Sequence, residues 1–313
     1  MTNKDPSQPV NRVLGGYELL ERTSVADGVI TFRARQVSLG RVVTMKVLPA
    51  ASAAKPALRA RFDRQVAAAS RLRHDNIVSA LDAGTAAGCL YVVFEELEGH
   101  SLVDAFARGT EFTTVQAIAI GLDIARALDH VATNHLIHRN VVPASILLTD
   151  HGHAKLAGFS AAKVRSTAGH ETWFEHDAPT ARYTAPEYVD GKKGIDIRAD
   201  IYSLGCILFH LATGRPPFDK GSAPEILARH VKEAPPDPRT LRDGLPDGLV
   251  RVLDRALRKE RSDRYQAPGE MVRDLELVRT GRPVERGAGT PIWKDRTALP
   301  LTSVLRGRTP KKP

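Results

Sequence analysis

The sequence predicts an α+β protein with a smaller, strand-rich N-terminal part and a larger, mainly helical C-terminal part. Segments with the composition of strands follow one another at residues 17–20, 28–34 and 42–48, with turn residues between them, which is typical of an antiparallel sheet. From residue 101 onward, apolar residues recur at helical spacing instead, most clearly over residues 115–131. This change of period predicts two parts with different secondary structure.

The other expected elements follow the same division. Residues 56–72 have the apolar spacing of a helix and residues 90–94 that of a strand, so the N-terminal part contains a helix besides its sheet. Residues 95–99 are expected to connect the two parts. Residues 200–211 are apolar on almost every side, as is typical of a helix at the centre of a domain.

One folded domain is predicted over residues 17–280, divided into an N-lobe at 17–97 and a C-lobe at 98–280. Residues 1–16 are polar and contain proline, so they are predicted to be disordered. Beyond these lobes the periodicity stops and Pro, Gly and Arg become frequent, so residues 281–313 are predicted to form a basic, disordered tail.

The composition is that of a folded protein from a reducing compartment. With 313 residues, 42% of them hydrophobic, the chain can bury a substantial core. Its two cysteines, Cys89 and Cys206, are too few for a disulfide framework and are predicted to be free thiols. The sequence has neither the apolar segment of a signal peptide nor an apolar run of about 18 residues. It therefore predicts no membrane span and a cytoplasmic location.

The positive charge is concentrated at the C-terminal end. Residues 279–313 contain nine Lys or Arg and two acidic residues, so they account for seven of the nine net positive charges. A nearly balanced folded region makes nucleic-acid binding an unfavoured interpretation. The tail is either a solvated segment or a segment that contacts an acidic partner, nucleic acid or a membrane surface.

Four motifs occur in the order and spacing of one known family. Residues 138–148, HRNVVPASILL, are similar to the catalytic loop of protein kinases, and residues 185–187, APE, to the motif that closes the activation segment. Residues 200–205, DIYSLG, and 214–218, GRPPF, are similar to the motifs that follow. Over residues 17–280 the chain thus resembles the bacterial, Hanks-type Ser/Thr protein kinases. The resemblance implies a bilobal protein-kinase-like fold.

The resemblance assigns structural roles to six residues that match the family pattern: His138, Arg139, Phe159, Glu187, Asp200 and Arg264. It implies an ion pair between Arg264 and Glu187 that ties the activation segment to the C-lobe. Loss of one partner of a buried pair typically costs a few kcal/mol.

The positions that carry out phosphoryl transfer differ from the family pattern. Asn140 replaces the Asp that acts as general base, and Val142 replaces the loop Lys. Ser145 replaces the Asn and Gly158 the Asp that hold magnesium. An amide cannot take a proton from a substrate hydroxyl, so the resemblance predicts no competent catalytic set and no metal site.

The phosphate-binding positions are also changed, with one exception. Lys46 matches the strand Lys that contacts nucleotide phosphates, but Gln65 stands where its helix Glu partner belongs. The three glycine positions of the phosphate-binding loop hold Ser24, Ala26 and Val29. Lys46 is therefore interpreted either as a weak phosphate ligand or as a Lys with a packed stem and a solvated amine.

These differences favour a catalytically impaired, pseudokinase-like domain that works as a binding, scaffold or regulatory module, and enzyme activity is not its expected main function. The expected partner is a protein such as an active kinase or its substrate, which could dock on the activation segment near Thr180 and Tyr183. No cofactor is expected to be required: ATP binding is predicted to be weak, and Mg²⁺ binding is not predicted. The alternative is an active or residually active Ser/Thr kinase, and a nucleotide-sensing module is a further alternative.

Overall fold

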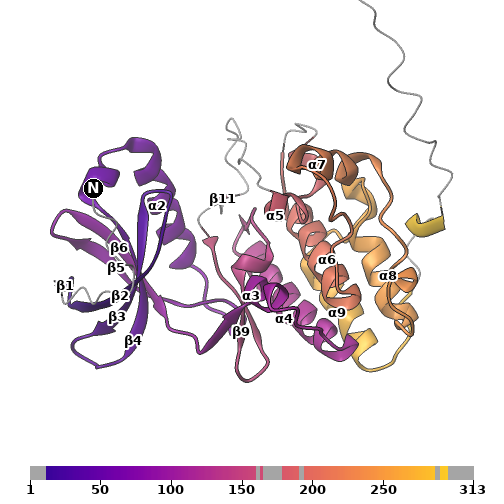
Figure 1. Ribbon diagram of the computed structural model, residues 1–313, viewed down its shortest axis with the longest axis horizontal. Helices are drawn as coiled ribbons and strands as arrows, with labels where there is room; N and C mark the ends of the chain where they lie inside the picture. The colour runs from indigo at the N-terminus through magenta and orange to yellow at the C-terminus, as the bar shows by residue number, and fades with distance from the viewer. Residues whose placement is uncertain (1–11, 160–162, 165–177, 190–193, 286–289, 295–313) are drawn as a thin grey trace, which may run out of the picture.

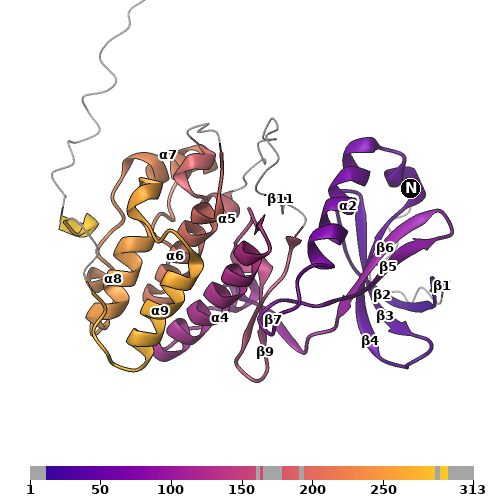
Figure 2. The ribbon, with the colours of Figure 1, turned by 180° about the vertical axis from the view of Figure 1, so that it is seen from behind.

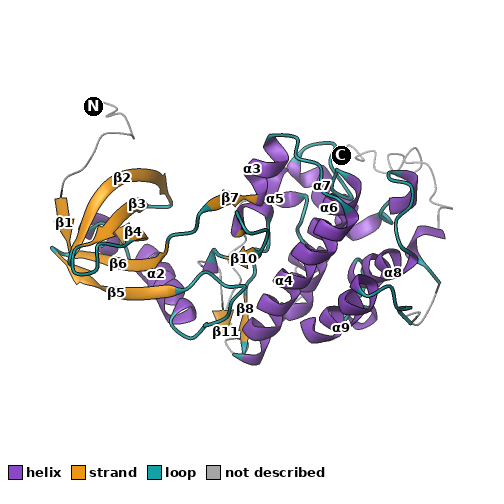
Figure 3. Ribbon diagram, turned by 90° about the horizontal axis from the view of Figure 1, so that it is seen from below, coloured by secondary structure: helices purple, strands orange, loops and turns teal. Residues whose placement is uncertain are grey.

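The protein consists of a sheet-based N-lobe and a helical C-lobe, which lie side by side in Figure 1. The computed structural model describes residues 12–159, 163–164, 178–189, 194–285 and 290–294. A single extended stretch of chain after the last long strand of the N-lobe leads into the C-lobe, as Figure 3 shows. The predicted division into a strand-rich and a helical part is confirmed.

The N-lobe contains a six-stranded antiparallel sheet with the order β1-β2-β3-β4-β6-β5. Its strands are β1 (Arg12–Leu14), β2 (Tyr17–Ala26), β3 (Val29–Gln36), β4 (Val42–Leu48), β5 (Ala80–Ala86) and β6 (Cys89–Glu95). A short helix α1 (Ala50–Ala53) precedes α2 (Pro56–Ala69), which lies between the sheet and the C-lobe (Figures 1 and 2). Phe62 of α2 packs with Leu48, Val92 and Phe94 of the sheet, so burial on one face fixes the helix there.

The C-lobe is built mainly from helices. These are α3 (Leu102–Ala107), α4 (Thr114–Thr133), α5 (Ala178–Ala181), α6 (Ile197–Thr213), α7 (Ala223–Lys232), α8 (Asp247–Ala256) and α9 (Pro268–Arg279). The short strands are β7 (Gly99–Ser101), β8 (Leu136–Ile137), β9 (Ile146–Thr149), β10 (Ala154–Leu156) and β11 (Lys163–Val164). They form a three-stranded sheet, β10-β9-β7, and a pair, β11-β8, next to the N-lobe. The short 3-10 helices are η1 (Pro143–Ser145), η3 (Pro186–Tyr188), η4 (Pro238–Thr240), η5 (Arg261–Asp263) and η6 (Ile292–Lys294).

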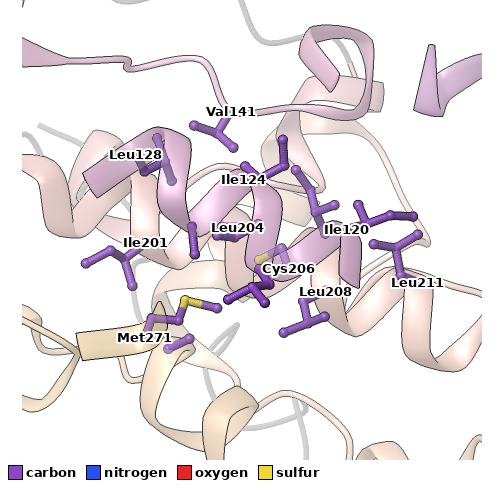
Figure 4. Packing of buried hydrophobic residues seen from close by; sticks show 14 of the residues in the cluster. Ile120, Ile124, Leu128, Val141, Ile201, Leu204, Cys206, Leu208, Leu211 and Met271 are labelled. Carbon is purple, nitrogen blue, oxygen red and sulfur yellow. The ribbon is translucent and has the colours of Figure 1, made fainter. Parts of the chain in front are cut away.

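Helix α6 is the centre of the C-lobe core. As the sequence predicts, it is buried on nearly all sides, and Figure 4 shows its Ile201, Leu204 and Leu208 beside Ile124 of α4 and Met271 of α9. Its start is capped by the Asp196 carboxylate, which accepts from the Arg198 amide, and its end by Gly214 in the left-handed conformation. This rigid helix supports the loop that carries the kinase-like motif.

At both ends of the chain, some described residues lie outside the predicted domain of residues 17–280. Arg12–Leu14, which fall in the segment predicted to be disordered, form β1 and pair with β2. After α9, Val284 and Trp293 are buried in the C-lobe core, although both lie in the predicted tail. Asp254 accepts a hydrogen bond from the Ile292 amide at 2.6 Å and so helps to hold this segment. Residues 286–289 and 295–313, which carry most of the tail's charge, lie outside the described residues.

Along the described stretches of the chain, no helix combines the length and the apolar character that crossing a bilayer would require.

Buried histidines give the fold a defined response to acid. Burial lowers the pKa of His138 and His210 to about 4 and that of His230 to about 3, against 6.5 for an exposed histidine. The unfolded chain therefore takes up these protons first, and each histidine should cost the folded state about 1.4 kcal/mol per pH unit as pH falls from about 6.5 towards 4. We expect the melting temperature to decrease over this interval.

The histidine contribution can be separated from that of carboxylates. Burial raises the pKa of Asp200 to about 7, so the folded chain takes up this proton before the unfolded chain does. This carboxyl therefore stabilises the folded state as the pH falls below about 7, opposite to the histidines. We expect His230→Gln to flatten the decrease in melting temperature between pH 7 and 5, whereas the exposed His151→Gln should leave it unchanged. Parallel pH profiles for wild type and His230→Gln would contradict this explanation.

Candidate functional site

A cavity of about 250 Å³ lies between the lobes, next to the connection from β6 to β7. Its walls come from β4, β6, the connecting residues, β9 and the segment that follows β10. The lining residues are Thr44, Lys46, Val78, Phe94, Glu95, Glu96, Leu97, Leu147, Ala157, Gly158 and Phe159. An apolar cavity with a few polar groups at one end is the usual form of a small-molecule site.

Polar side chains close one end of this cavity. The Thr44 hydroxyl donates to the Glu96 carboxylate at 2.6 Å, and Arg33 pairs with the same carboxylate at 3.2 Å. Next to it, Glu95 accepts from the Lys155 ammonium at 2.8 Å. The carboxylates at the connection are thus already paired, and the cavity between them is walled by apolar side chains.

Lys46 of β4 also lines this cavity. Its ammonium is 5.7 Å from the centre of the Phe94 ring, and among the described residues no carboxylate lies within ion-pair distance of it. Burial, and to a lesser degree the nearby Arg61 guanidinium, lower the pKa of Lys46. Gln65 of α2 is buried and lines a second cavity together with Lys46, so the structure brings the two predicted residues together. A buried cation without a carboxylate partner suits an anionic ligand.

The loop that contains Asn140 is held by buried bonds to α6. The His138 and Arg139 amides donate to the two oxygens of Asp200 at 2.8 and 2.9 Å. His138 also donates from Nε2 to the Ala157 carbonyl at 2.8 Å and packs edge-on against the Phe159 ring. These contacts connect the loop to the central helix α6 and to the segment after β10. They involve four of the residues with expected structural roles: His138, Arg139, Phe159 and Asp200.

The replaced chemical positions lie close together. The Ser145 hydroxyl donates to the Val142 carbonyl at 2.8 Å and accepts from the Val142 amide at 3.1 Å, so it is engaged within its own loop. Gly158 lies against Ser145, and a Cβ on Gly158 would be 3.3 Å from the Ser145 Cβ. Asn140 is half-buried, and its backbone N–H donates to His138 Nδ1 at 3.3 Å. At the two positions where the family pattern has a carboxylate, this chain has the Asn140 amide and the side-chain-free Gly158, and at the position of the family Asn it has the Ser145 hydroxyl.

The backbone at Gly158 suits only glycine. Its φ is +85°, and its missing side chain makes room for Ser145. We expect Gly158→Ala to lower the free energy of unfolding by about 1–2 kcal/mol, because alanine is strained at a left-handed φ. The close contact of the new Cβ with Ser145 should lower it further. Gly152→Ala is the matched control, because Gly152 has a φ of +81° with nothing within 4 Å of a Cβ. Equal losses in chemical denaturation would show that the Ser145 contact costs nothing.

The activation segment joins the C-lobe through its C-terminal end. Glu187 and Arg264 form a bidentate pair with both distances at 2.8 Å, as the family resemblance implies. The predicted docking residue Tyr183 is buried, and its hydroxyl lies 2.8 Å from His210 Nδ1. Residues 160–162 and 165–177 of this segment lie outside the described residues.

Two features of the site are not apparent in the motifs. The loop between β2 and β3 is a tight two-residue hairpin at Asp27 and Gly28, and Asp27 pairs with Arg61 of α2 at 2.9 Å. Arg61 is four residues before Gln65, so helical spacing would have placed both on the same face of α2. The bond from Thr44 to Glu96 has no comparable signal, because it joins two strands through their side chains.

Residues 27–273 match the family model described as the protein kinase domain. The chain belongs to the protein kinase domain family. Its relatives include the serine/threonine-protein kinase PknB of Mycobacterium leprae, 36% identical over 80% of this chain and 41% of the relative, and PknB of M. tuberculosis, 37% identical over 86% of this chain and 44% of the relative. The chain thus spans about two fifths of the length of these curated relatives. A crystal structure of the M. tuberculosis PknI kinase domain is similar with a TM-score of 0.63 and 26% identity, over 87% of this chain and 98% of that one. The predicted bilobal kinase fold is confirmed.

Membership in this family corrects the prediction about cofactors. We expected that no cofactor is required, that ATP binds weakly and that Mg²⁺ does not bind. This expectation was wrong, because the matched family and its Ser/Thr kinase relatives imply the use of ATP and Mg²⁺.

The residues of the kinase domain fit a nucleotide. The cavity can take a base between its apolar walls, and the Lys46 ammonium, which has no carboxylate partner among the described residues, can take a phosphate. At the family's two metal positions, Gly158 has no side chain and Ser145 has only a neutral hydroxyl, so Mg²⁺ that enters with ATP would be held mainly through phosphate oxygens. When bound, the ion would neutralise phosphate charge.

Proposed function

We propose that this kinase domain binds a nucleotide between its lobes, transfers phosphate slowly, and works mainly by binding a protein partner. The proposal rests on a difference between two parts of the site, the part that would bind a nucleotide and the part that would transfer its phosphate. Lys46 and the apolar cavity are suited to a nucleotide, whereas Asn140 stands where phosphoryl transfer needs a base. The family implies a protein as partner or substrate.

The binding half of the proposal rests on charge and shape. A lysine whose pKa is lowered by burial gains a counter-ion when a phosphate binds, so binding relieves its desolvation. Phe94, Leu147 and Ala157 provide apolar contacts for a planar base. The carboxylates of Glu95 and Glu96 are paired with Lys155 and Arg33, and this pairing limits their repulsion of phosphate.

The slow-transfer half rests on the loop between Asn140 and Ser145. A positioned general base typically contributes about 10²- to 10⁴-fold to a rate, and the Asn140 amide cannot act as one. The Ser145 hydroxyl is bonded to Val142, and Gly158 packs against it. Phosphoryl transfer depends mostly on positioning and charge neutralisation, which these replacements weaken.

An active Ser/Thr kinase is the second candidate, and a specific observation favours it. Relatives named serine/threonine-protein kinases are 36–37% identical to this chain over most of its length. Lys46, His138 and Asp200 are all in place. Under this candidate the transfer step would use an arrangement that does not need a carboxylate at residue 140.

Nucleotide binding is tested by thermal unfolding with ATP, with and without Mg²⁺. At a hundredfold excess of ATP over its dissociation constant we expect about 2.7 kcal/mol of stabilisation, and Lys46→Ala should lose most of it. The exposed Lys55→Ala, in the same lobe, is the matched control and should respond like wild type. Absence of any shift in wild type would refute nucleotide binding, and an unchanged shift in Lys46→Ala would refute the role of this lysine.

A further inference from the structure

A second cavity of about 180 Å³ lies beneath the hairpin between β2 and β3. It is lined by both strands, by β4 and by one face of α2. The lining residues are Ser24, Ala26, Asp27, Val29, Thr31, Lys46, Leu58, Arg61, Phe62 and Gln65. Lys46 is the one residue that lines both described cavities, so the two cavities adjoin at this residue.

The hairpin is closed onto α2. Asp27 and Gly28 both have a positive φ, of +53° and +75°, which gives the tight turn at the tip. Gly28 lies so close to α2 that a Cβ there would be 2.9 Å from Leu58 Cδ1. Asp27 adds an ion pair to Arg61 at 2.9 Å. The tip of the hairpin is thus docked on the helix by one close apolar contact and one pair of charges.

The cavity has an excess of positive charge. Lys46 and Arg61 both face it, and the only described carboxylate among its lining residues is Asp27, whose side chain is 59% exposed. The other polar groups are the hydroxyls of Ser24 and Thr31 and the amide of Gln65. Two neighbouring cations repel each other, and a bound anion would replace this repulsion by attraction to both.

The family resemblance already implies phosphate binding at Lys46 and the hairpin above it. We propose that Arg61 is a second ligand for the terminal phosphates in this cavity, and that Asp27 is the group that the phosphates displace from Arg61. This proposal rests on the proposed nucleotide function. A base in the first cavity would direct its phosphates to Lys46, and from there the second cavity is the adjoining space. A guanidinium is well suited to phosphate because its N–H groups match two oxygens at once.

The site has a consequence for the reaction. No residue of the loop from 138 to 148 is among the residues that line the second cavity. A terminal phosphate held by Arg61 would therefore lie away from Asn140. Bound in this way, the nucleotide would stabilise the domain without being set up for transfer.

The test uses three probes on the full chain: adenosine, inorganic triphosphate and ATP, each titrated by calorimetry. We expect Arg61→Gln to weaken the binding of triphosphate and of ATP at least about tenfold and to leave adenosine unchanged. Asp27→Asn should strengthen the binding of triphosphate, because it removes a competing negative charge. Arg59→Gln is the matched control, since Arg59 lies on the same helix and is paired with the exposed Asp63. It should bind all three probes like wild type.

The outcomes separate this site from the proposed function. If Arg61→Gln binds triphosphate as wild type does, or if Asp27→Asn weakens its binding, the site is refuted, whereas adenosine binding would still support the nucleotide function. Conversely, triphosphate binding that depends on Arg61, together with no binding of adenosine or ATP, would support the phosphate site and refute the nucleotide function.

Discussion

Replacement of Arg264 by alanine is expected to lower the free energy of unfolding by about 3–5 kcal/mol. The guanidinium and the Glu187 carboxylate are almost fully buried, with side-chain exposures of 0% and 2%. Arg264 also donates to three backbone carbonyls, those of Arg258, Lys259 and Arg198. Its removal would leave a buried carboxylate and several acceptors without donors, which is why the loss exceeds that of an ordinary ion pair.

Chemical denaturation of Arg264→Ala measures this loss. Arg239→Ala is the control, because its pair with Asp237 is exposed and should contribute less than about 1 kcal/mol. The double variant Glu187→Leu/Arg264→Leu should be less destabilised than Arg264→Ala, because it leaves no unpaired charge. A loss below 1 kcal/mol in Arg264→Ala would mean that the buried pair does not support the C-lobe.

Asn140→Asp is expected to raise the rate of phosphate transfer by about 10²-fold or more, within the range that a general base contributes. The side chains have nearly the same shape, and the loop is fixed by the bonds of His138 and Arg139 to Asp200, so the carboxylate should take the place of the amide without rearrangement. Initial rates with radiolabelled ATP and Mg²⁺ measure the gain.

A control variant distinguishes the base from a general change of the loop. Asn140→Ala removes the amide without adding a base and should transfer phosphate no faster than wild type. The melting temperatures of both variants should stay near that of wild type. A rate for Asn140→Asp within twofold of wild type would show that a missing base does not limit transfer.

Motifs predicted the parts of the molecule that depend on residue type at a fixed position. The kinase fold, the buried helix α6 and the pairing of Glu187 with Arg264 all follow from short motifs in a set order. The same reasoning identified Asn140, Ser145 and Gly158 as changed positions, and their effect on catalysis stays a prediction. The prediction about cofactors was wrong, because the matched family and its Ser/Thr kinase relatives imply ATP and Mg²⁺, and the replaced groups leave the cavity and Lys46 in place.

Contacts between distant side chains that no family motif marks were not predictable. The pair of Asp27 with Arg61 requires the hairpin to bend onto α2, which no local pattern specifies. Trp293 packs into the C-lobe from a segment whose composition resembles a disordered tail, because a single buried aromatic residue can hold a polar stretch in place.

The most direct test of the account is the rate of phosphate transfer by the wild-type chain to a generic protein substrate, with ATP and Mg²⁺, beside the kinase domain of M. tuberculosis PknB at equal concentration. Since the base is replaced, we expect this chain to transfer phosphate at least about 10²-fold more slowly while it still binds ATP. A rate within tenfold of PknB that is abolished by Lys46→Ala would contradict it and would show that the chain is an active kinase.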